Sequence, residues 1–337
     1  MKPFWKDVAA GLLMGFVLPG VFLNFAVLVL KQPQAATSAS ETVCFTVSDA
    51  SETTESAALP MRMQLQRPDG TVEQMDMDDY LVGVVLAEMP AWFEEEALKA
   101  QAVVARTYTL KAYTTGGKHG NGSVCTQSGC CQAYISRDEY IRSGGTGENV
   151  EKVRRAVEET SDCVLVYQGD LIEATYFSCS GGSTEDAVAV WGTDYPYLRA
   201  VSSPGEEEAA HYSDTVYFET AHFCEALDIS PEGSPAEWIG KPEYTPGGGV
   251  SRIPIGGKTF TGVQLRQLLG LRSTAISLSP GETGITVITK GFGHRVGMSQ
   301  YGADAMAASG SSYPEILKHY YGGAELVEWT ESENSSQ

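Results

Sequence analysis

Positive charge is scarce in this sequence. Its 23 Lys and Arg residues face 43 Asp and Glu residues, which gives a formal net charge of −20 at pH 7. No basic stripe occurs along the chain, whereas a protein that binds nucleic acid needs clustered Lys and Arg to neutralise phosphates. We therefore exclude nucleic acid as a partner and interpret the acidity as a solvated surface. The sequence also contains no internal repeat.

Charge of either sign is missing from residues 8–30, VAAGLLMGFVLPGVFLNFAVLVL, with Lys2 and Lys6 before this stretch and Lys31 after it. The stretch is long enough to span a bilayer as one helix, whereas a cleaved signal peptide usually has a shorter apolar region. We predict a single-pass anchor with residues 1–7 in the cytoplasm and the bulk of the chain outside the cell membrane. The small residues of QPQAATSA leave cleavage open as the alternative.

The remaining chain divides by composition. Residues 31–60 are rich in Ser, Thr, Ala and Glu with little periodicity, which predicts a flexible linker. Residues 61–327 carry strand-like and helix-like patterns and predict one α+β domain with two lobes around a cleft. Turns, acids and Gly-Gly pairs dominate residues 203–258, which suggest the second lobe or a large insertion. Residues 328–337 are typical of a disordered tail.

The folded part begins with a hairpin and two helices. RMQLQ alternates, Pro68-Asp69-Gly70 marks a turn, and a second strand follows. Asp78 or Asp79 can cap a helix that begins near Tyr80 and ends by Pro90. A second helix covers residues 94–113 and carries on one face Leu98, Ala102, Ala105 and Thr109.

Later segments alternate between the hydrophobic period of a strand and that of a helix. VEKVRRAVEET predicts a short amphipathic helix, and GDLIEATYFSCSGG predicts a turn followed by a strand. A strand followed by a helix is predicted for VYFETAHFCEALDI. A strand followed by a glycine turn is predicted for GITVITKGFG. LRQLLGL, GADAMAASG and YPEILKHYYGG predict three helices near the end of the chain.

Glu88 is the one carboxylate inside the apolar stretch YLVGVVLAEMP. It falls in the last turn of the first predicted helix, where the negative end of the helix dipole and the apolar neighbours both oppose ionisation. A carboxyl group that stays protonated near neutral pH suits a general acid. The structural alternative is a glutamate that faces solvent or pairs with Lys99 or Arg106.

A second candidate site lies in KHGNGSVCTQSGCCQAY, which holds His119, Cys125, Cys130 and Cys131 among the seven cysteines of the chain. Imidazole and thiolates suit zinc, and three protein ligands would leave a fourth position for water or substrate. The spacing does not match the familiar zinc-finger patterns, so a polar loop with incidental thiols remains an alternative. A cysteine nucleophile with His119 as its base is a third reading.

GFGHRVGMSQYGA places His294 between glycines and follows it with Ser299, Gln300 and Tyr301. Polar groups flanked by glycine suit hydrogen bonding to a ligand rich in hydroxyl groups. A tight turn from strand to helix explains the same glycines.

Several short segments occur in the order and wording of one known family. They are LAEMP, EALKAQAVVARTYTL, CQAY, SCSGG, VWG, YPYL, LRQLLGLRST and GFGHRVGMSQYGA. Over roughly residues 62–323 the chain resembles the stage II sporulation protein D family, membrane-anchored lytic transglycosylases of endospore-forming bacteria. The resemblance implies an enzyme that cleaves the MurNAc–GlcNAc bond of peptidoglycan glycan strands already stripped of stem peptides, in the space between mother cell and forespore during engulfment.

The resemblance also implies roles for particular residues. Glu88 would act first as acid on the glycosidic oxygen and then as base on the muramic acid 6-hydroxyl, giving a 1,6-anhydro product. Substrate contacts would come from Lys99, Arg106, Gln132, Tyr134, Ser178, Ser180 and His294. Some members look like zinc proteins, and here His119, Cys125 and Cys131 would hold the ion, with Cys130 as a competing ligand.

Partners follow from the same resemblance: a cell-wall amidase and a membrane-tethering protein of the engulfment machinery. Two positions depart from the family. Arg295 follows His294 where glycine is usual, and Cys179 stands in SCSGG where threonine is common. Both departures would affect substrate contacts rather than the reaction.

Two other functions remain as competing hypotheses. One is a zinc-dependent cell-wall hydrolase in which His119, Cys125 and Cys131 activate water against an amide. The other is a non-catalytic wall-binding scaffold, in which Glu88→Gln would leave function untouched.

Overall fold

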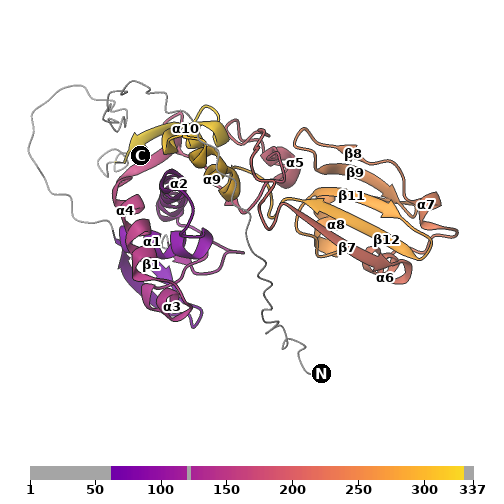
Figure 1. The fold of residues 1–337 in the computed structure, drawn as a ribbon, viewed down its shortest axis with the longest axis horizontal. Helices are drawn as coiled ribbons and strands as arrows, with labels where there is room; N and C mark the ends of the chain where they lie inside the picture. Colours follow the sequence, from indigo (N-terminus) through magenta and orange to yellow (C-terminus); the bar gives the residue numbers. More distant parts are fainter. Residues whose placement is uncertain (1–61, 120–122, 330–337) are drawn as a thin grey trace, which may run out of the picture. The chain divides into compact units, whose positions relative to one another are not determined.

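The computed structural model describes residues 62–119 and 123–329, all within one compact unit of the chain. The predicted cytoplasmic segment, anchor and linker lie outside these described residues, as does most of the predicted tail. None of the helices formed by the described residues has the length and apolar character needed to cross a membrane. The described chain is a mixed α and β protein with several small sheets (Figure 1).

The N-terminal hairpin forms as the sequence predicts. Strands β1 (Arg62–Gln66) and β2 (Val72–Asp76) pair antiparallel around a turn in which Gly70 adopts a positive φ of 84°. The first helix, α1, covers Met77–Glu88 and therefore begins earlier than expected. Its N-cap is Asp76, whose carboxylate accepts a hydrogen bond from the Asp78 amide, so the predicted caps Asp78 and Asp79 lie inside the first turn.

A first apolar core surrounds helix α2 (Glu95–Thr114), which is in contact with α1, α4, α9, α10 and β4. The predicted face of Leu98, Ala102, Ala105 and Thr109 is buried there. Figure 1 shows α2 surrounded by these elements. The elements of this part are β3 (Val124–Cys125), α3 (Arg137–Arg142), α4 (Gly147–Glu158), β4 (Cys163–Tyr167), β5 (Asp170–Leu171), β6 (Tyr176–Phe177), α5 (Ala187–Trp191), β13 (Met298–Ser299), α9 (Gln300–Ala308), α10 (Tyr313–Tyr320) and β14 (Glu325–Glu328).

A second, separate apolar core runs from Phe223 to Val287, so it overlaps residues 203–258 and extends beyond them. Its central sheet has the order β11-β12-β7, and a smaller sheet has the order β10-β9-β8. Figure 1 shows these strands in orange beside α6 and α8. The elements are β7 (Ser213–Glu219), α6 (Thr220–Leu227), α7 (Pro235–Trp238), β8 (Glu243–Tyr244), β9 (Val250–Ile255), β10 (Lys258–Phe260), α8 (Gly262–Leu268), β11 (Ala275–Pro280) and β12 (Gly284–Lys290).

A buried ion pair fastens the segment after β12 to two other loops. Arg295 is 2% exposed and donates to the carbonyls of Ser180 (2.8 Å), Ser183 (2.7 Å) and Gly247 (2.7 Å), while Glu185 lies 3.3 Å from its guanidinium. Arg295 therefore directs its charge into this buried network and is not among the residues that line the cavity of His294.

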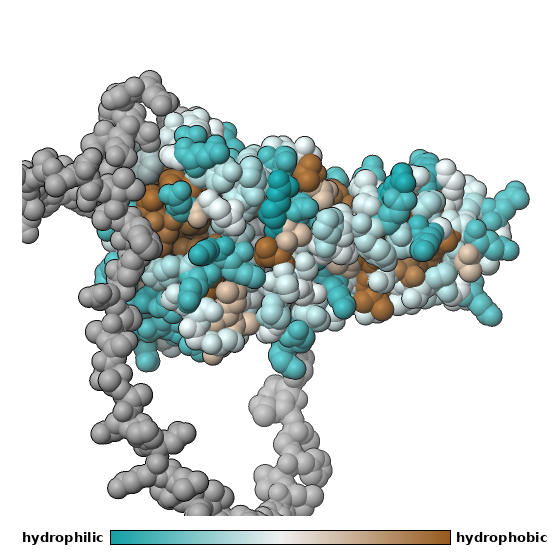
Figure 2. All heavy atoms as spheres, turned by 90° about the horizontal axis from the view of Figure 1, so that it is seen from above, coloured by the Kyte–Doolittle hydropathy of each residue, from teal (hydrophilic) through white to brown (hydrophobic). Residues whose placement is uncertain are grey.

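Cys179, the other departure, is also buried. Its thiol donates to a Glu206 carboxylate oxygen at 3.0 Å, and Ser180 donates to the same carboxylate through its amide (2.6 Å) and its hydroxyl (2.9 Å). Cys179 therefore belongs to a buried hydrogen-bond network. On the face shown in Figure 2, hydrophilic residues predominate and hydrophobic residues form separate groups.

Candidate functional site

A cavity of about 750 Å³ contains Glu88. Its walls come from α1, α2, β6, α5, α8, α9 and the loops between them. Among the described residues that line it, Glu88 is the only carboxylate. A second cavity of about 390 Å³ adjoins it, because the two share Tyr108, Lys118, Cys131, Thr175 and Trp191. The result is a continuous hollow with one acid in its larger part.

Glu88 is the last residue of α1 and is partly buried. The Ala133 amide donates to its Oε1 at 2.7 Å, and the side chains of Tyr176 and Gln300 also hydrogen-bond to it. Burial raises the pKa of this carboxyl above its usual value, and the three hydrogen bonds oppose the rise. Glu88 therefore holds its proton to a higher pH than an exposed glutamate, while donors are in place for the carboxylate that remains when the proton leaves.

A glycine in α1 explains how the Ala133 amide reaches Glu88. A Cβ atom at Gly83 would lie 2.4 Å from Cε2 of Tyr134 and 2.8 Å from the carbonyl oxygen of Ile135. The Ile135 amide in turn donates to the Gly83 carbonyl at 3.2 Å. Because Gly83 has no side chain, the segment from Gln132 to Ile135 can cross closely over α1 and aim its amide at the end of the helix.

Gln132 holds the other side of this segment. It is 1% exposed, and its amide nitrogen donates to Thr109 Oγ1 at 2.9 Å and to the Tyr80 hydroxyl at 3.2 Å. Its carbonyl oxygen accepts from the Tyr176 hydroxyl at 3.1 Å. Gln132 thus fixes Tyr176, which is itself a partner of Glu88.

His294 is positioned beside the same strand. Its Nδ1 accepts from the Val296 amide at 3.1 Å, and it bonds to the backbone of Tyr176, which assigns the proton to Nε2. Its ring lies 5.2 Å from that of Trp191 and 5.7 Å from that of Phe177. Burial, followed by the charge of Arg266, lowers the pKa of His294 to about 4. A neutral His294 therefore acts as a positioning residue for Tyr176.

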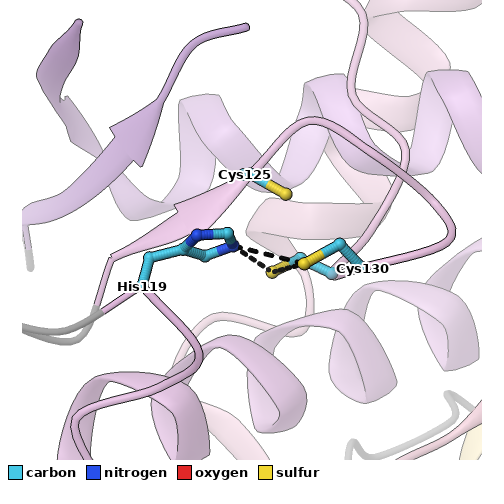
Figure 3. A group of neighbouring side chains, drawn as sticks. His119, Cys125 and Cys130 are labelled. Atoms are coloured by element: carbon cyan, nitrogen blue, oxygen red, sulfur yellow. Dashed lines mark hydrogen bonds between the residues drawn. The ribbon is translucent and has the colours of Figure 1, made fainter. Parts of the chain in front are cut away.

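The predicted metal residues come together at the edge of the same cavity. His119 Nε2 lies 3.3 Å from Cys130 Sγ and 3.4 Å from Cys131 Sγ, and the two sulfurs are 4.0 Å apart (Figure 3). With Cys125, which is buried, the four donor atoms all lie within 4.8 Å of one another. A tetrahedral zinc ion would place two sulfurs about 3.8 Å apart and sulfur and nitrogen about 3.6 Å apart. The donor set therefore fits zinc.

The predicted substrate residues separate into two groups. Gln132, Ser178 and His294 line the cavity with Glu88. Lys99 instead pairs with Glu96 and Glu159 at 2.8 and 2.7 Å, so it is not the partner of Glu88. The three remaining candidates, Arg106, Tyr134 and Ser180, lie outside this cavity.

Those three residues contact other residues of the fold. Arg106 is 2% exposed and donates to the carbonyls of Thr160 (2.6 Å) and Val157 (3.1 Å). Tyr134 stacks on Tyr80 with ring centroids 5.7 Å apart. The sequence alone did not single out Tyr176, Trp191, Arg266 or Phe292 as lining residues, although all four stand in or near the matched segments SCSGG, VWG, LRQLLGLRST and GFGHRVGMSQYGA.

The fold and site define a mixed α and β protein in which one carboxyl of raised pKa and two thiols of a zinc-type cluster line the same cavity. Residues 67–167 match the family model described as stage II sporulation protein. The chain is 39% identical to stage II sporulation protein D of Bacillus subtilis (strain 168) over 263 residues, which cover 77% of this chain and 76% of the relative. The corresponding protein of Bacillus amyloliquefaciens is 38% identical over the same shares.

The chain therefore belongs to the stage II sporulation protein D family. It is also similar to a protein named amidase enhancer from Bacillus subtilis (strain 168), with 29% identity over 302 residues that cover 74% of this chain and 40% of that protein.

Proposed function

We propose that this protein is a peptidoglycan lytic transglycosylase in which Glu88 is the single general acid and base. The observation that carries the proposal is that Glu88 is the only carboxylate among the described residues lining the cavity and has a raised pKa. Glycoside hydrolases of the retaining and inverting kinds place two carboxyl groups about 5–10 Å apart. A reaction that uses one carboxyl first as acid and then as base fits this cavity better than a reaction that needs two carboxyl groups.

In the proposed reaction the Glu88 proton passes to the glycosidic oxygen as the bond from C1 of the muramic acid breaks. The resulting carboxylate, stabilised by Ala133, Tyr176 and Gln300, accepts the proton of the C6 hydroxyl as O6 bonds to C1. The products are a 1,6-anhydro sugar and a free 4-hydroxyl end. Glu88 regains its proton, and no water is consumed.

Exposed aromatic rings in the cavity support a sugar substrate. Trp191 and Phe292 are 43% and 39% exposed and line the same walls as Glu88. Such rings offer apolar faces to the C–H faces of sugars. The names of the relatives, stage II sporulation protein D and amidase enhancer, support a role at the cell wall during sporulation. We extend the proposal to glycan strands without stem peptides, to an amidase and a tethering membrane protein as partners, and to a place in the cell membrane.

We also propose that His119, Cys125, Cys130 and Cys131 hold a zinc ion. The ion would polarise its ligands and cross-link the loop between α2 and Gln132. Four protein donors fill a tetrahedral site, which is typical of structural zinc, whereas catalytic zinc keeps one position open. Because Cys131 is two residues before Ala133, this cross-link would hold the amide that donates to Glu88.

The test is mass spectrometry of the products formed from denuded glycan strands by the full chain in mild detergent, with and without a chelator. Glu88→Gln is compared with Glu173→Gln, because Glu173 is a carboxylate of the adjoining cavity that pairs with Lys111 at 2.9 Å. We expect anhydro-ended fragments from the wild type and from Glu173→Gln but not from Glu88→Gln. Intact cell wall, which still carries stem peptides, is treated in parallel. Release of stem peptides from it that depends on zinc and survives Glu88→Gln would instead establish the zinc hydrolase.

A further inference from the structure

Arg266 stands out among the arginines of this acidic chain. It lies on α8, is half-buried, and lines the cavity together with Glu88 and His294. It forms no hydrogen bond or ion pair with another described residue. Every other described arginine that is at least partly buried has such a partner; they are Arg67, Arg106, Arg154, Arg272 and Arg295. Within residues 62–119 and 123–329, this acidic chain thus leaves one cavity guanidinium without an acidic partner.

The position of Arg266 is fixed by the second apolar core. The neighbouring residue Leu265 is fully buried in that core, and α8 is in contact with β9 and α6. The charge of Arg266 acts inside the cavity, because it contributes to lowering the pKa of His294. A flexible surface arginine would keep its head in water, whereas this guanidinium is carried by a packed helix into a cavity.

The other polar groups of the cavity do not satisfy Arg266. Glu88, the only carboxylate among the described lining residues, is bonded to Ala133, Tyr176 and Gln300. The other lining cation, Lys118, already donates to the Cys130 carbonyl. Burying a charged group without a partner costs free energy, and a carboxylate that pairs with a guanidinium through two hydrogen bonds recovers it.

We propose that Arg266 binds the lactyl carboxylate of a muramic acid residue and so selects glycan strands from which the stem peptide has been removed. The proposal rests on the proposed function. In an intact strand the lactyl group is joined to the peptide through an amide, which is neutral and larger. Removal of the peptide exposes a carboxylate, the group that a free guanidinium recognises best. The second apolar core then supplies substrate selection, while α1 supplies the acid.

The experiment compares denuded glycan strands with the same strands after their lactyl carboxylates have been converted to methylamides. kcat/KM is measured for the wild-type full chain, Arg266→Gln, Arg266→Lys and the control Arg252→Gln, since Arg252 is an exposed arginine paired with Glu243 outside the cavity. We expect wild type and Arg252→Gln to prefer the free carboxylate by about 10- to 100-fold. Arg266→Gln should lose this preference, and Arg266→Lys should keep part of it.

Equal cleavage of both substrates by the wild type, or an undiminished preference in Arg266→Gln, would overturn the proposal. Binding of the two kinds of strand to Glu88→Gln, with and without Arg266→Gln, is measured by calorimetry as a second readout. If the wild type cleaves neither strand, the proposed function fails, and the binding comparison still decides whether Arg266 recognises the carboxylate. A tighter Kd for the free carboxylate that depends on Arg266 supports the inference, and equal Kd values reject it.

Discussion

Replacing Gly83 by alanine tests whether the close crossing over α1 sets the geometry of the acid. The added Cβ would lie 2.4 Å from the Tyr134 ring and 2.8 Å from the Ile135 carbonyl, so the segment from Gln132 to Ile135 must move. Overpacking of this kind costs about 1–3 kcal/mol. Alanine recovers up to about 1 kcal/mol because it favours helix over glycine. We therefore expect a net loss of about 1–2 kcal/mol of unfolding free energy.

The effect on catalysis should exceed the effect on stability. A displacement of about 1 Å at a catalytic group can cost about 100-fold in rate, and the moving segment carries the amide that bonds Glu88 at 2.7 Å. We expect kcat for glycan cleavage to fall by about that factor, while Tm falls by roughly 2–8 °C. Activity is followed by the release of anhydro-ended fragments and stability by calorimetry.

Gly147→Ala is the matched control, because Gly147 lies in the first turn of α4 and a Cβ there would meet no atom within 4 Å. We expect its activity and Tm to equal or exceed those of the wild type. If Gly83→Ala is as active and as stable as this control, the close crossing does not position Ala133, and our account of the site is wrong.

Three further predictions concern pH, metal and the buried ion pair. Because the pKa of Glu88 is raised in the folded state, folding favours its protonated form, and the wild type loses stability as pH rises through that pKa. Glu88→Gln should therefore have a higher Tm than the wild type at pH 8 and an equal Tm near pH 4. A Tm of Glu88→Gln below that of the wild type at pH 8 would contradict this prediction. The cobalt-substituted protein should show the absorption of a tetrahedral thiolate site. Cys130→Ser should lower the intensity of its thiolate-to-cobalt charge-transfer band by about one third. An unchanged band would remove Cys130 from the ligand set. Arg295→Met should lower the free energy of unfolding, measured with denaturant, by about 3–5 kcal/mol, because it leaves the Glu185 carboxylate without its cation. The double variant Arg295→Met with Glu185→Leu should recover part of that loss. If the losses of the two substitutions simply add, the pairing is refuted.

Local features of the fold could be read from the sequence because their causes are local. The alternation of RMQLQ and the turn at Gly70 produce the first hairpin, and the apolar spacing of α2 buries the expected face. Glu88 also follows from local pattern, since a helix that ends before Pro90 leaves it in the last turn. The boundary error at the start of α1 arose because the sequence prediction considered only Asp78 and Asp79 as caps. Asp76, two residues earlier, offers the same side chain, and the backbone conformation there makes it the N-cap.

Part of the metal cluster could also be predicted from the sequence, because its residues are close together along the chain. His119, Cys125 and Cys131 lie within a short stretch of sequence, so their chemistry suggests a common ligand. The sequence left the place of Cys130 open, because two adjacent thiols compete until the loop conformation decides which can reach the imidazole. In the structure both sulfurs lie within 3.4 Å of His119 Nε2.

The sequence by itself therefore determined the principal elements, the candidate acid and the family, and it suggested His119, Cys125 and Cys131 as zinc-type ligands. Tertiary structure decided which polar groups meet Glu88: the Ala133 amide 45 residues away and the side chains of Tyr176 and Gln300. It also directed Arg106 and Arg295 into buried networks and placed Arg266 in the cavity without a partner among the described residues. The physical reason is that periodicity and capping act over a few residues, whereas contacts between distant segments depend on how whole helices and strands pack.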